Sequence, residues 1–343
     1  MYYHPGRGLN PFSIAQFDQK ALKRFSLLLR KGNYDIVFFR YIFGTKLIDT
    51  VRRVLPNAVI VVDNDVLMTR LTGQAWQIGK TFRNRFFLFE SWKLERFERS
   101  LFNQPHLFFF SNSSEMKLVQ DKFIRKTSRS QFACIPNIMP RVGKEQATPA
   151  KDRPYILFFG VLDSTINADA FRFLAKDIYP HIRDCLAKHD VRIRIVGKRM
   201  PPLFQALVSD LACEHIELVG EVDDMEEAIA KSLFCLVPLR MGTGTKTRLL
   251  EAAALAKTTI TTPMGVEGLD FSDQEIMVRD TPRGLALAVE ELLEHPERAE
   301  ELGANMRDKS LALYSESRVA GQLLDHIERF CARAHDPSPS LRT

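Results

Sequence analysis

Short β-rich runs alternate with helical patterns along the second half of the chain. Runs typical of strands cover residues 155–159, 192–196, 216–219, 234–239 and 258–262, and helical patterns cover residues 168–188, 203–212, 225–232 and 248–256. Strands that alternate with helices form parallel sheets with right-handed crossovers. The second half is therefore predicted to be a doubly wound α/β domain.

The first half shows the same alternation more weakly. Strands are expected at residues 35–39, 58–62, 107–110 and 131–135, with a long helix within residues 74–102. Residues 141–154 are polar, contain Gly and Pro, and are typical of a linker. We expect an N-terminal Rossmann-like domain over residues 1–145 and a second Rossmann-like domain over residues 151–315. A C-terminal helix over residues 316–334 is expected to pack back on the first domain, and residues 335–343 are expected to form a frayed tail.

The composition excludes several classes of protein. The 343 residues are 45% hydrophobic and 26% charged, as in ordinary globular chains large enough for two cores. No apolar run approaches the roughly 18 residues of a membrane-spanning helix, and no secretion signal is visible. The five cysteines form no C-x-x-C pair, and the eight histidines show no metal-ligand spacing. These features predict a cytoplasmic protein without a disulfide framework or a metal site.

Charge is divided unevenly between the two halves. Residues 1–150 contain 24 Lys and Arg against 11 Asp and Glu, a net charge of +13, whereas residues 151–343 contain 24 against 31, a net charge of −7. A basic half can attract phosphates, nucleic acid or an anionic lipid surface. Residues 80–102 interleave Phe and Trp with Lys and Arg, which fits either peripheral contact with an anionic membrane or a core helix with a basic outer face. The sequence contains no nucleic-acid recognition motif.

A Gly-rich loop in the second half is the strongest candidate for a binding site. Residues 234–269 read FCLVPLRMGTGTKTRLLEAAALAKTTITTPMGVEGL, a strand, a loop, a helix start, a second strand and a second loop. Gly242 and Gly244 allow the backbone to approach a ligand, and Thr245 offers a hydroxyl. Lys246 and Arg248 add positive charge at a helix N-terminus. Such a loop can cradle a diphosphate.

Two common phosphate motifs do not fit this loop. A Walker A motif needs Gly directly before the Lys, but Thr245 precedes Lys246, and no G-x-G-x-x-G follows from Gly244. The loop alone could equally be a plain strand-to-helix turn. Glu251 favours a ligand, because a carboxylate about one and a half helical turns beyond Lys246 can accept both hydroxyls of a ribose. A carboxylate that is satisfied within the first helical turn is the alternative.

The segment resembles the donor-site signature of the retaining, nucleotide-sugar-dependent glycosyltransferases of family 4 (glycosyl transferases group 1), which have the GT-B fold. The matching motifs are Pro238-Leu239-Arg240, Gly242-Thr243-Gly244-Thr245-Lys246-Thr247-Arg248, Leu250-Glu251-Ala252 and Thr262-Pro263-Met264-Gly265-Val266-Glu267-Gly268-Leu269. Supporting pieces occur in the expected order, namely Gly160 with Asn167, Gly197-Lys198, Gly220-Glu221-Val222-Asp223, Asp63-Asn64-Asp65, Phe110-Ser111-Asn112 and Ile135-Pro136-Asn137. The resemblance covers roughly residues 35–330.

The resemblance implies two Rossmann-like parallel-sheet domains that face each other across a cleft. Lys246 and Arg248 would hold the donor diphosphate, and Glu251 would bind the ribose. Val222 and Asp223 would border the nucleobase, and Gly265 and Glu267 would meet the sugar or its phosphate. The remaining donor-binding residues would be Gly160, Lys198, Gly242, Gly244 and Thr245.

The implied reaction transfers a sugar, with retention, from a nucleoside diphosphate sugar to a hydroxyl of a saccharide or lipid-linked acceptor in cell-surface polysaccharide synthesis. Cations and a helix N-terminus can stabilise the departing diphosphate, so no metal or cofactor is expected. Asp63 and Asp65 are the catalytic candidates on the acceptor side, because a carboxylate at a strand end can orient or deprotonate a hydroxyl. An Asx turn that caps the next helix is the structural alternative.

The sequence departs from the family pattern in two places. Thr243 stands where many members carry an acid eight residues before the helix Glu. The first strands and Gly-rich turn expected before residue 35 are also missing, so we expect a shortened N-terminal domain, either because the true start lies upstream or because the acceptor side is degenerate. This second departure leaves open a non-catalytic relative that binds nucleotide sugars or supports a partner subunit. A GT-B epimerase is a further alternative, although its carboxylate and histidine pattern is not found.

Overall fold

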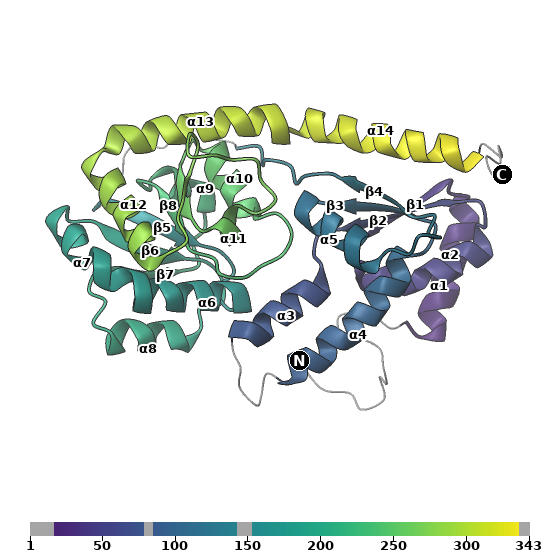
Figure 1. The fold of residues 1–343 in the computed structure, drawn as a ribbon, viewed down its shortest axis with the longest axis horizontal. Coiled ribbons are helices and arrows are strands. Elements are labelled where there is room, and N and C mark those ends of the chain that lie inside the picture. Colours follow the sequence, from purple (N-terminus) through teal and green to yellow (C-terminus); the bar gives the residue numbers. More distant parts are fainter. Residues whose placement is uncertain (1–16, 79–84, 143–152, 336–343) are drawn as a thin grey trace. The chain divides into compact units, whose positions relative to one another are not determined.

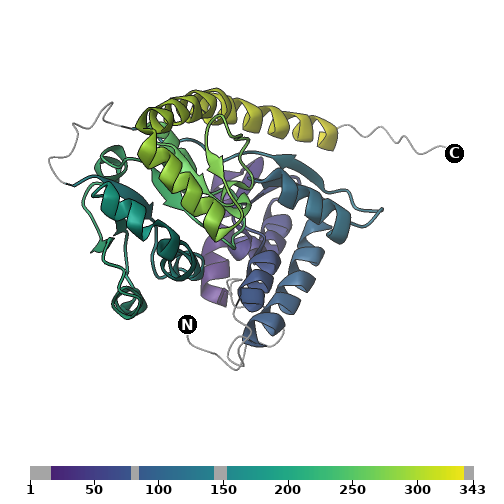
Figure 2. The same ribbon diagram turned by 60° about the vertical axis from the view of Figure 1, so that its left-hand side comes forward.

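The computed structural model describes residues 17–78, 85–142 and 153–335 of the chain. The chain forms two compact units, unit 1 with residues 1–136 and 320–343, and unit 2 with residues 137–319. Each unit is built on a parallel sheet with helices packed around it (Figures 1 and 2). The predicted α/β class with two Rossmann-like sheets is confirmed. Most of the predicted linker and of the predicted tail lies outside the described residues.

Unit 1 contains a sheet of four parallel strands in the order β1-β2-β3-β4. These are β1 (Ile36–Arg40), β2 (Val59–Asn64), β3 (Leu107–Phe110) and β4 (Gln131–Cys134). All four residues of β3 are buried, as expected for an apolar strand that is covered on both faces. Since the strand order follows the sequence, every crossover runs in the same direction across this sheet.

Side chains of β2 point alternately to two separate cores. Ile60 and Val62 belong to a core shared with several of the helices that precede β1 or connect the strands. These helices are α1 (Gln19–Gly32), α2 (Ile48–Val54), α3 (Met68–Ile78), α4 (Arg85–Phe102) and α5 (Ser113–Phe123). Val59 and Val61 instead pack with Phe330 of the last helix, α14 (Glu316–His335). The C-terminal segment thus covers the second face of the unit 1 sheet.

A buried carboxylate joins α4 to the start of α3. Glu98 is fully buried and accepts hydrogen bonds from the backbone N–H groups of Met68 (2.9 Å) and Thr69 (3.3 Å). Burial raises the pKa of Glu98 to about 7, although these hydrogen bonds favour its ionised form. Glu98 thereby caps α3, a contact that the sequence did not predict.

Unit 2 contains six parallel strands in the order β10-β9-β8-β5-β6-β7. They are β5 (Tyr155–Phe159), β6 (Arg192–Val196), β7 (Ile216–Gly220), β8 (Cys235–Val237), β9 (Thr259–Thr261) and β10 (Met277–Val278). The chain builds outward from β5 to β7 and then returns to place β8 on the other side of β5. The loops that follow β5 and β8 therefore diverge at a topological switch point, where ligands bind in open parallel sheets.

The helices of unit 2 differ from the expected boundaries in one informative place. They are α6 (Thr165–Phe173), α7 (Tyr179–Lys188), α8 (Pro202–Asp210), α9 (Met225–Ala230), α10 (Thr247–Ala254), α11 (Pro263–Val266), α12 (Pro282–Glu294) and α13 (Pro296–Tyr314). The expected single helix over residues 168–188 is wrong. It begins earlier, where Ser164 accepts from the Asn167 N–H, and a π-helical turn at residues 174–178 precedes α7, whose Pro180 carries no N–H.

Strand β8 is shorter than expected and ends at Val237 rather than at residue 239. Pro238 follows directly and cannot donate a hydrogen bond to the ladder. The early end leaves Arg240 and the Gly-rich residues free to form a loop at the edge of the sheet.

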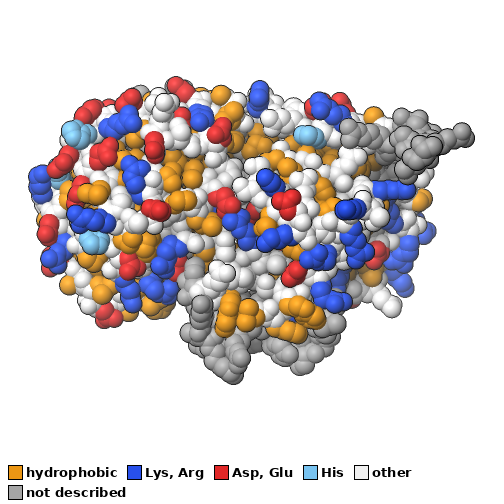
Figure 3. Space-filling view, in the orientation of Figure 1, with side chains coloured by type: hydrophobic (Ala, Val, Ile, Leu, Met, Phe, Trp, Pro, Cys, Tyr) orange, Lys and Arg blue, Asp and Glu red, His pale blue; other side chains and the backbone are white. Residues whose placement is uncertain are grey.

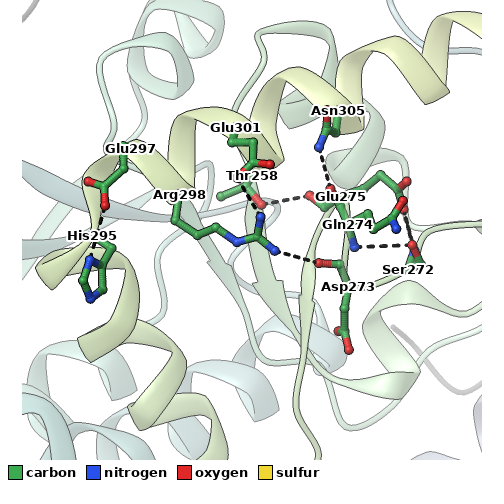
Figure 4. Close-up of polar contacts among 10 residues, drawn as sticks. All are labelled: Thr258, Ser272, Asp273, Gln274, Glu275, His295, Glu297, Arg298, Glu301 and Asn305. Atoms are coloured by element: carbon green, nitrogen blue, oxygen red, sulfur yellow. Dashed lines mark hydrogen bonds and ion pairs between the residues drawn. The ribbon is translucent and has the colours of Figure 1, made fainter.

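Polar contacts fasten the segment before β10 to its neighbours (Figure 4). Arg298 and Asn305 of α13 donate to the backbone carbonyls of Asp273 (3.5 Å) and Gln274 (3.0 Å). Thr258 Oγ1 donates to the carbonyl of Glu275 at 3.0 Å. Backbone groups of an irregular segment are satisfied in this way, and the edge strand is fixed beside β9.

Two helical glycines, Gly303 in unit 2 and Gly321 in unit 1, differ in how closely their surroundings pack against them. A Cβ on Gly303 of α13 would lie 2.1 Å from the Ala256 carbonyl oxygen, whereas a Cβ on Gly321 of α14 would meet no atom within 4 Å. We expect Gly303→Ala to lower the free energy of unfolding by about 1–3 kcal/mol through overpacking. The matched change Gly321→Ala should raise it by about 0.5–1 kcal/mol, because alanine is the better helix former. Denaturant unfolding measures both, and equal effects of the two changes would contradict the packing around Gly303.

Candidate functional site

The predicted donor-side residues all lie beyond the carboxyl ends of the unit 2 strands. Gly160 follows β5, and the Gly-rich loop (residues 241–246) follows β8. The others are Lys198 after β6, Val222 and Asp223 after β7, and Gly265 and Glu267 after β9. Because β5 and β8 are neighbours, Gly160 and the Gly-rich loop flank the switch point.

Arg248 ties the first turn of α10 to the end of β5. Its Nη1 donates to the carbonyl of Phe159 at 3.0 Å, and its Nη2 donates to Asn167 Oδ1 at 2.8 Å. Asn167 is itself buried and donates from Nδ2 to the Val161 carbonyl at 2.8 Å. Burial lowers the pKa of Arg248 to about 10, while Glu251 raises it. The guanidinium is thus held in one place with its positive charge largely desolvated.

Gly160 leaves the space that Arg248 and Asn167 occupy. Its φ is +146°, and a Cβ there would lie 2.8 Å from Asn167 Nδ2 and 3.0 Å from Arg248 Nη2. The end of β6 also lies close to Gly160, since a Cβ on Gly197 would lie 1.8 Å from the Gly160 carbonyl oxygen. Neither position can take a side chain without displacing backbone or the buried guanidinium.

The Gly-rich loop wraps around the ammonium group of Lys246. Lys246 is 7% exposed, and its Nζ donates to the Gly244 carbonyl at 2.9 Å. A Cβ on Gly242, whose φ is +148°, would lie 3.2 Å from Lys246 Cε. Helix α10 begins directly after this lysine, so the ammonium and the first N–H groups of the helix lie together. A cation beside a helix N-terminus is suited to an anion such as a phosphate.

Glu251 lies one turn beyond Arg248 on α10. Burial raises the pKa of Glu251, and the positive charge of Arg248 opposes this shift. The two side chains therefore influence each other's charge at the start of the helix. Binding of a ribose by this carboxylate stays a prediction.

The other predicted donor residues have separate surroundings. Lys198 is exposed and forms an ion pair with Glu221 at 3.0 Å. Asp223 is exposed and Val222 packs partly against the core, at the end of an edge strand that β5 and β6 separate from β8. Gly265 is buried in α11, where its N–H donates to Thr262 Oγ1 at 3.0 Å, and Glu267 follows that helix directly. These residues line up along the edge of the sheet at which the Gly-rich loop lies.

In unit 1, Asp63 and Asp65 lie at the carboxyl end of β2. Arg40 Nη1 is 3.7 Å from Asp63 Oδ2, and the N–H of Tyr41 donates to the Asp63 carbonyl at 2.8 Å. Burial raises the pKa of Asp63, Arg40 lowers it, and Asp65 raises it further. Tyr41 has a φ of +62°, a conformation that non-glycine residues seldom adopt and that the sequence did not predict.

The helix-cap alternative for Asp65 can be compared with the contacts at α3. The first N–H groups of α3 donate to Glu98, a residue of α4 that lies 30 positions further along the chain than Met68. Sequence spacing gave no signal for this cap, because the two residues meet only through tertiary packing.

In the described residues, no group of three or more His, Cys, Asp or Glu is arranged to hold a metal ion.

The coupling of Arg248 and Glu251 predicts a pH effect on stability. Without the positive charge of Arg248, the pKa of Glu251 in the folded protein should rise further above its unfolded value. The folded state then binds more protons than the unfolded state, so stability is lost as the pH rises. We expect the free energy of unfolding of Arg248→Gln to fall more steeply than that of the wild type above about pH 5. Denaturant unfolding over a pH series measures this slope.

The double variant Arg248→Gln/Glu251→Gln is the matched control for this experiment. It lacks the titrating carboxyl group, so the added slope should disappear. A slope that persists in the double variant would show that another group causes it.

Comparisons with known proteins agree with the fold. Residues 153–295 match the family model described as "Glycosyl transferases group 1". No curated protein matches the chain in sequence. This matched range contains the Gly-rich loop, Arg248 and Glu251.

Several solved structures share the architecture of the whole chain. A sucrose-phosphate synthase from Thermosynechococcus elongatus superposes with a TM-score of 0.69 at 16% identity, over 91% of this chain and 77% of that chain. Anabaena HepE in complex with UDP and glucose gives 0.69 at 10% identity, over 92% and 84%. A glycosyltransferase from Rickettsia africae gives 0.66 at 14% identity, over 92% and 84%. The two parallel sheets form the GT-B fold, as predicted, and the domain match together with this fold supports a GT-B glycosyltransferase.

Proposed function

We propose that this protein transfers a sugar, with retention and without a metal ion, from a nucleoside diphosphate sugar to a hydroxyl acceptor. The observation that carries the proposal is the group of Lys246, Arg248 and the N-terminus of α10 at the switch point of unit 2. The structural neighbour HepE has been solved with UDP-glucose, which is a nucleoside diphosphate sugar.

The charge of the site fits the departure of a nucleoside diphosphate. Breaking the sugar–phosphate bond leaves negative charge on the diphosphate, and a fixed cation at a helix N-terminus stabilises that charge in the transition state. Lys246 Nζ would exchange its bond to the Gly244 carbonyl for a phosphate oxygen, while Gly242 lets the backbone approach. Arg248 is already oriented by Phe159 and Asn167, so little side-chain entropy is lost when it interacts with the donor.

The remaining donor residues would contact the nucleoside and the sugar. Glu251 would accept hydrogen bonds from the ribose hydroxyls, and the nearby charge of Arg248 favours the ionised form that this requires. Val222 and Asp223 would border the base, and Gly265 and Glu267 would meet the sugar or its phosphate.

On the acceptor side, we assign Asp63 the role of orienting or deprotonating the incoming hydroxyl. Burial raises its pKa, which makes the ionised carboxylate a stronger base than an exposed aspartate. Asp65 is the second candidate. The acceptor that we propose is a saccharide or a lipid-linked saccharide of the cell surface.

Substitution of the two principal donor residues tests the site. We expect Lys246→Ala and Glu251→Ala each to weaken binding of the cognate nucleoside diphosphate at least tenfold, about 1.4 kcal/mol. Isothermal titration with UDP, GDP and ADP measures the affinity. Lys188→Ala is the matched control, because Lys188 is an exposed lysine of unit 2 that pairs with Glu294. Unchanged affinities in folded Lys246 and Glu251 variants would remove the proposed site.

An assay of sugar transfer distinguishes an enzyme from a non-catalytic protein that only binds nucleotide sugars. The wild type should hydrolyse or transfer the sugar of the donor whose nucleotide it binds. Binding without either reaction, across a set of saccharide acceptors, would favour the non-catalytic alternative.

We further propose that α4 contacts an anionic membrane. In the described residues no helix has the length and apolar character needed to cross a bilayer, so the contact would be peripheral. Phe89 and Trp92 of α4 are 52% and 45% exposed, and their rings stack with centroids 5.9 Å apart. The guanidinium carbon of Arg96 lies 5.5 Å from the centroid of the Trp92 ring. Figure 3 shows hydrophobic side chains in the part where Figure 1 draws α3 and α4, and many Lys and Arg side chains over unit 1.

Aromatic side chains flanked by cations suit the interface of an anionic bilayer. We expect the double variant Phe89→Ser/Trp92→Ser to lose most of its binding to vesicles that contain phosphatidylglycerol, measured by co-sedimentation. Leu287→Ser is the matched control, since Leu287 is equally exposed but lies on α12 of the acidic unit 2. Equal binding of the wild type and the Phe89/Trp92 variant would contradict membrane contact through α4.

A further inference from the structure

Helix α6 contacts the Gly-rich segment at three points. Asn167 accepts a hydrogen bond from Arg248, directly after the loop. The Cδ1 atom of Ile166 lies 3.9 Å from the position that a Cβ on Gly242 would take, within the loop. Asp169 binds Arg240, directly before the loop. One helix thus contacts the start, the middle and the end of the segment.

The contact between Asp169 and Arg240 is the most constrained of the three. Arg240 Nε donates to Asp169 Oδ2 at 3.1 Å, and Arg240 Nη2 donates to Asp169 Oδ1 at 2.7 Å. The Arg240 guanidinium also lies over the ring of Phe173, 4.5 Å from its centroid. Two parallel hydrogen bonds and a stacked ring fix both the plane and the position of the guanidinium.

Because Asp169 is buried, its carboxylate depends on a cation that is close and well oriented. The Asp169 side chain is only 3% exposed, so an ionised carboxylate there needs a strong, well-oriented cation. Arg172 is also near, and its side chain is 40% exposed against 38% for Arg240, but its Nη1 is 3.9 Å from Asp169 Oδ1 whereas Arg240 Nη2 is at 2.7 Å. Arg240 therefore makes the short contacts with Asp169. Its Nε and Nη2 donate to this carboxylate of α6 and not to a ligand.

We propose that Asp169 is a positioning residue for donor binding: by fixing Arg240, it holds the Gly242–Lys246 loop in the conformation that receives the diphosphate. This inference rests on the proposed function of that loop. Asn167 and Arg248 fix the far end of the same segment, so loss of the Asp169 contact removes the ion-pair anchor at the near end. A loop that is held less firmly must be ordered when the donor binds, which weakens binding.

Four variants test the proposal, namely Asp169→Asn, Arg240→Gln, the double variant, and Arg172→Gln as the matched control. Affinity for UDP, GDP and ADP is measured by titration, and amide hydrogen exchange is measured over residues 241–247. We expect each single variant to bind the cognate nucleotide at least tenfold more weakly and to exchange faster in this segment. The double variant should be no weaker than the single variants, because the two residues act through one contact. Arg172→Gln should match the wild type.

A merely structural role of Asp169 would lower the unfolding midpoint and leave the affinity of the folded protein unchanged. That result, or additive losses in the double variant, would overturn the proposal. Arg240→Lys, which keeps the charge but loses the planar fork, provides a milder change should Asp169→Asn fail to fold, and it should show the same pattern with smaller losses. If the wild type binds none of the three nucleotides, the proposed function fails, whereas unchanged exchange in residues 241–247 would refute the positioning role by itself.

Discussion

The hydrogen bonds of the Arg248 guanidinium are the interaction on which the rest of the candidate site depends. A partly buried cation is stable only where oxygen atoms accept its hydrogen bonds, and here they come from the end of β5 and from the first turn of α6. Gly160 must lack a side chain to leave this space. The first turn of α10 is therefore fixed to the centre of the sheet, and Lys246 is placed with it.

Local patterns in the sequence predicted the parts of the structure that depend on neighbouring residues. Alternation of apolar runs predicted the parallel sheets, and the motif around Lys246 and Arg248 predicted where a strand, a loop and a helix start would meet. Strand β8 ends earlier than its apolar run predicts, because Pro238 has no N–H to donate to the ladder. Contacts such as Arg240 with Asp169 join residues 71 positions apart, and no spacing rule marks such partners before the fold is known.

The two units differ in their likeness to known proteins. The family match covers residues 153–295 and lies within unit 2. The role proposed for unit 1 depends on the fold and on its own residues, above all on the partly buried Asp63 beside Arg40. The strained backbone at Tyr41 lies at the same strand ends, where a rigid arrangement of polar groups would help to orient an acceptor.

The close approach of Gly160 and Gly197 has a consequence for how proteins of this architecture could diversify. With 1.8 Å between a hypothetical Cβ on Gly197 and the carbonyl oxygen of Gly160, the ends of β5 and β6 cannot accept a larger residue, so the backbone between them keeps one shape. If the proposed function holds, preferences for base or sugar would change through the segments after β7 and β9, where Asp223 is exposed and Glu267 partly exposed. The same scaffold could then serve different donors without any change at the centre of the sheet.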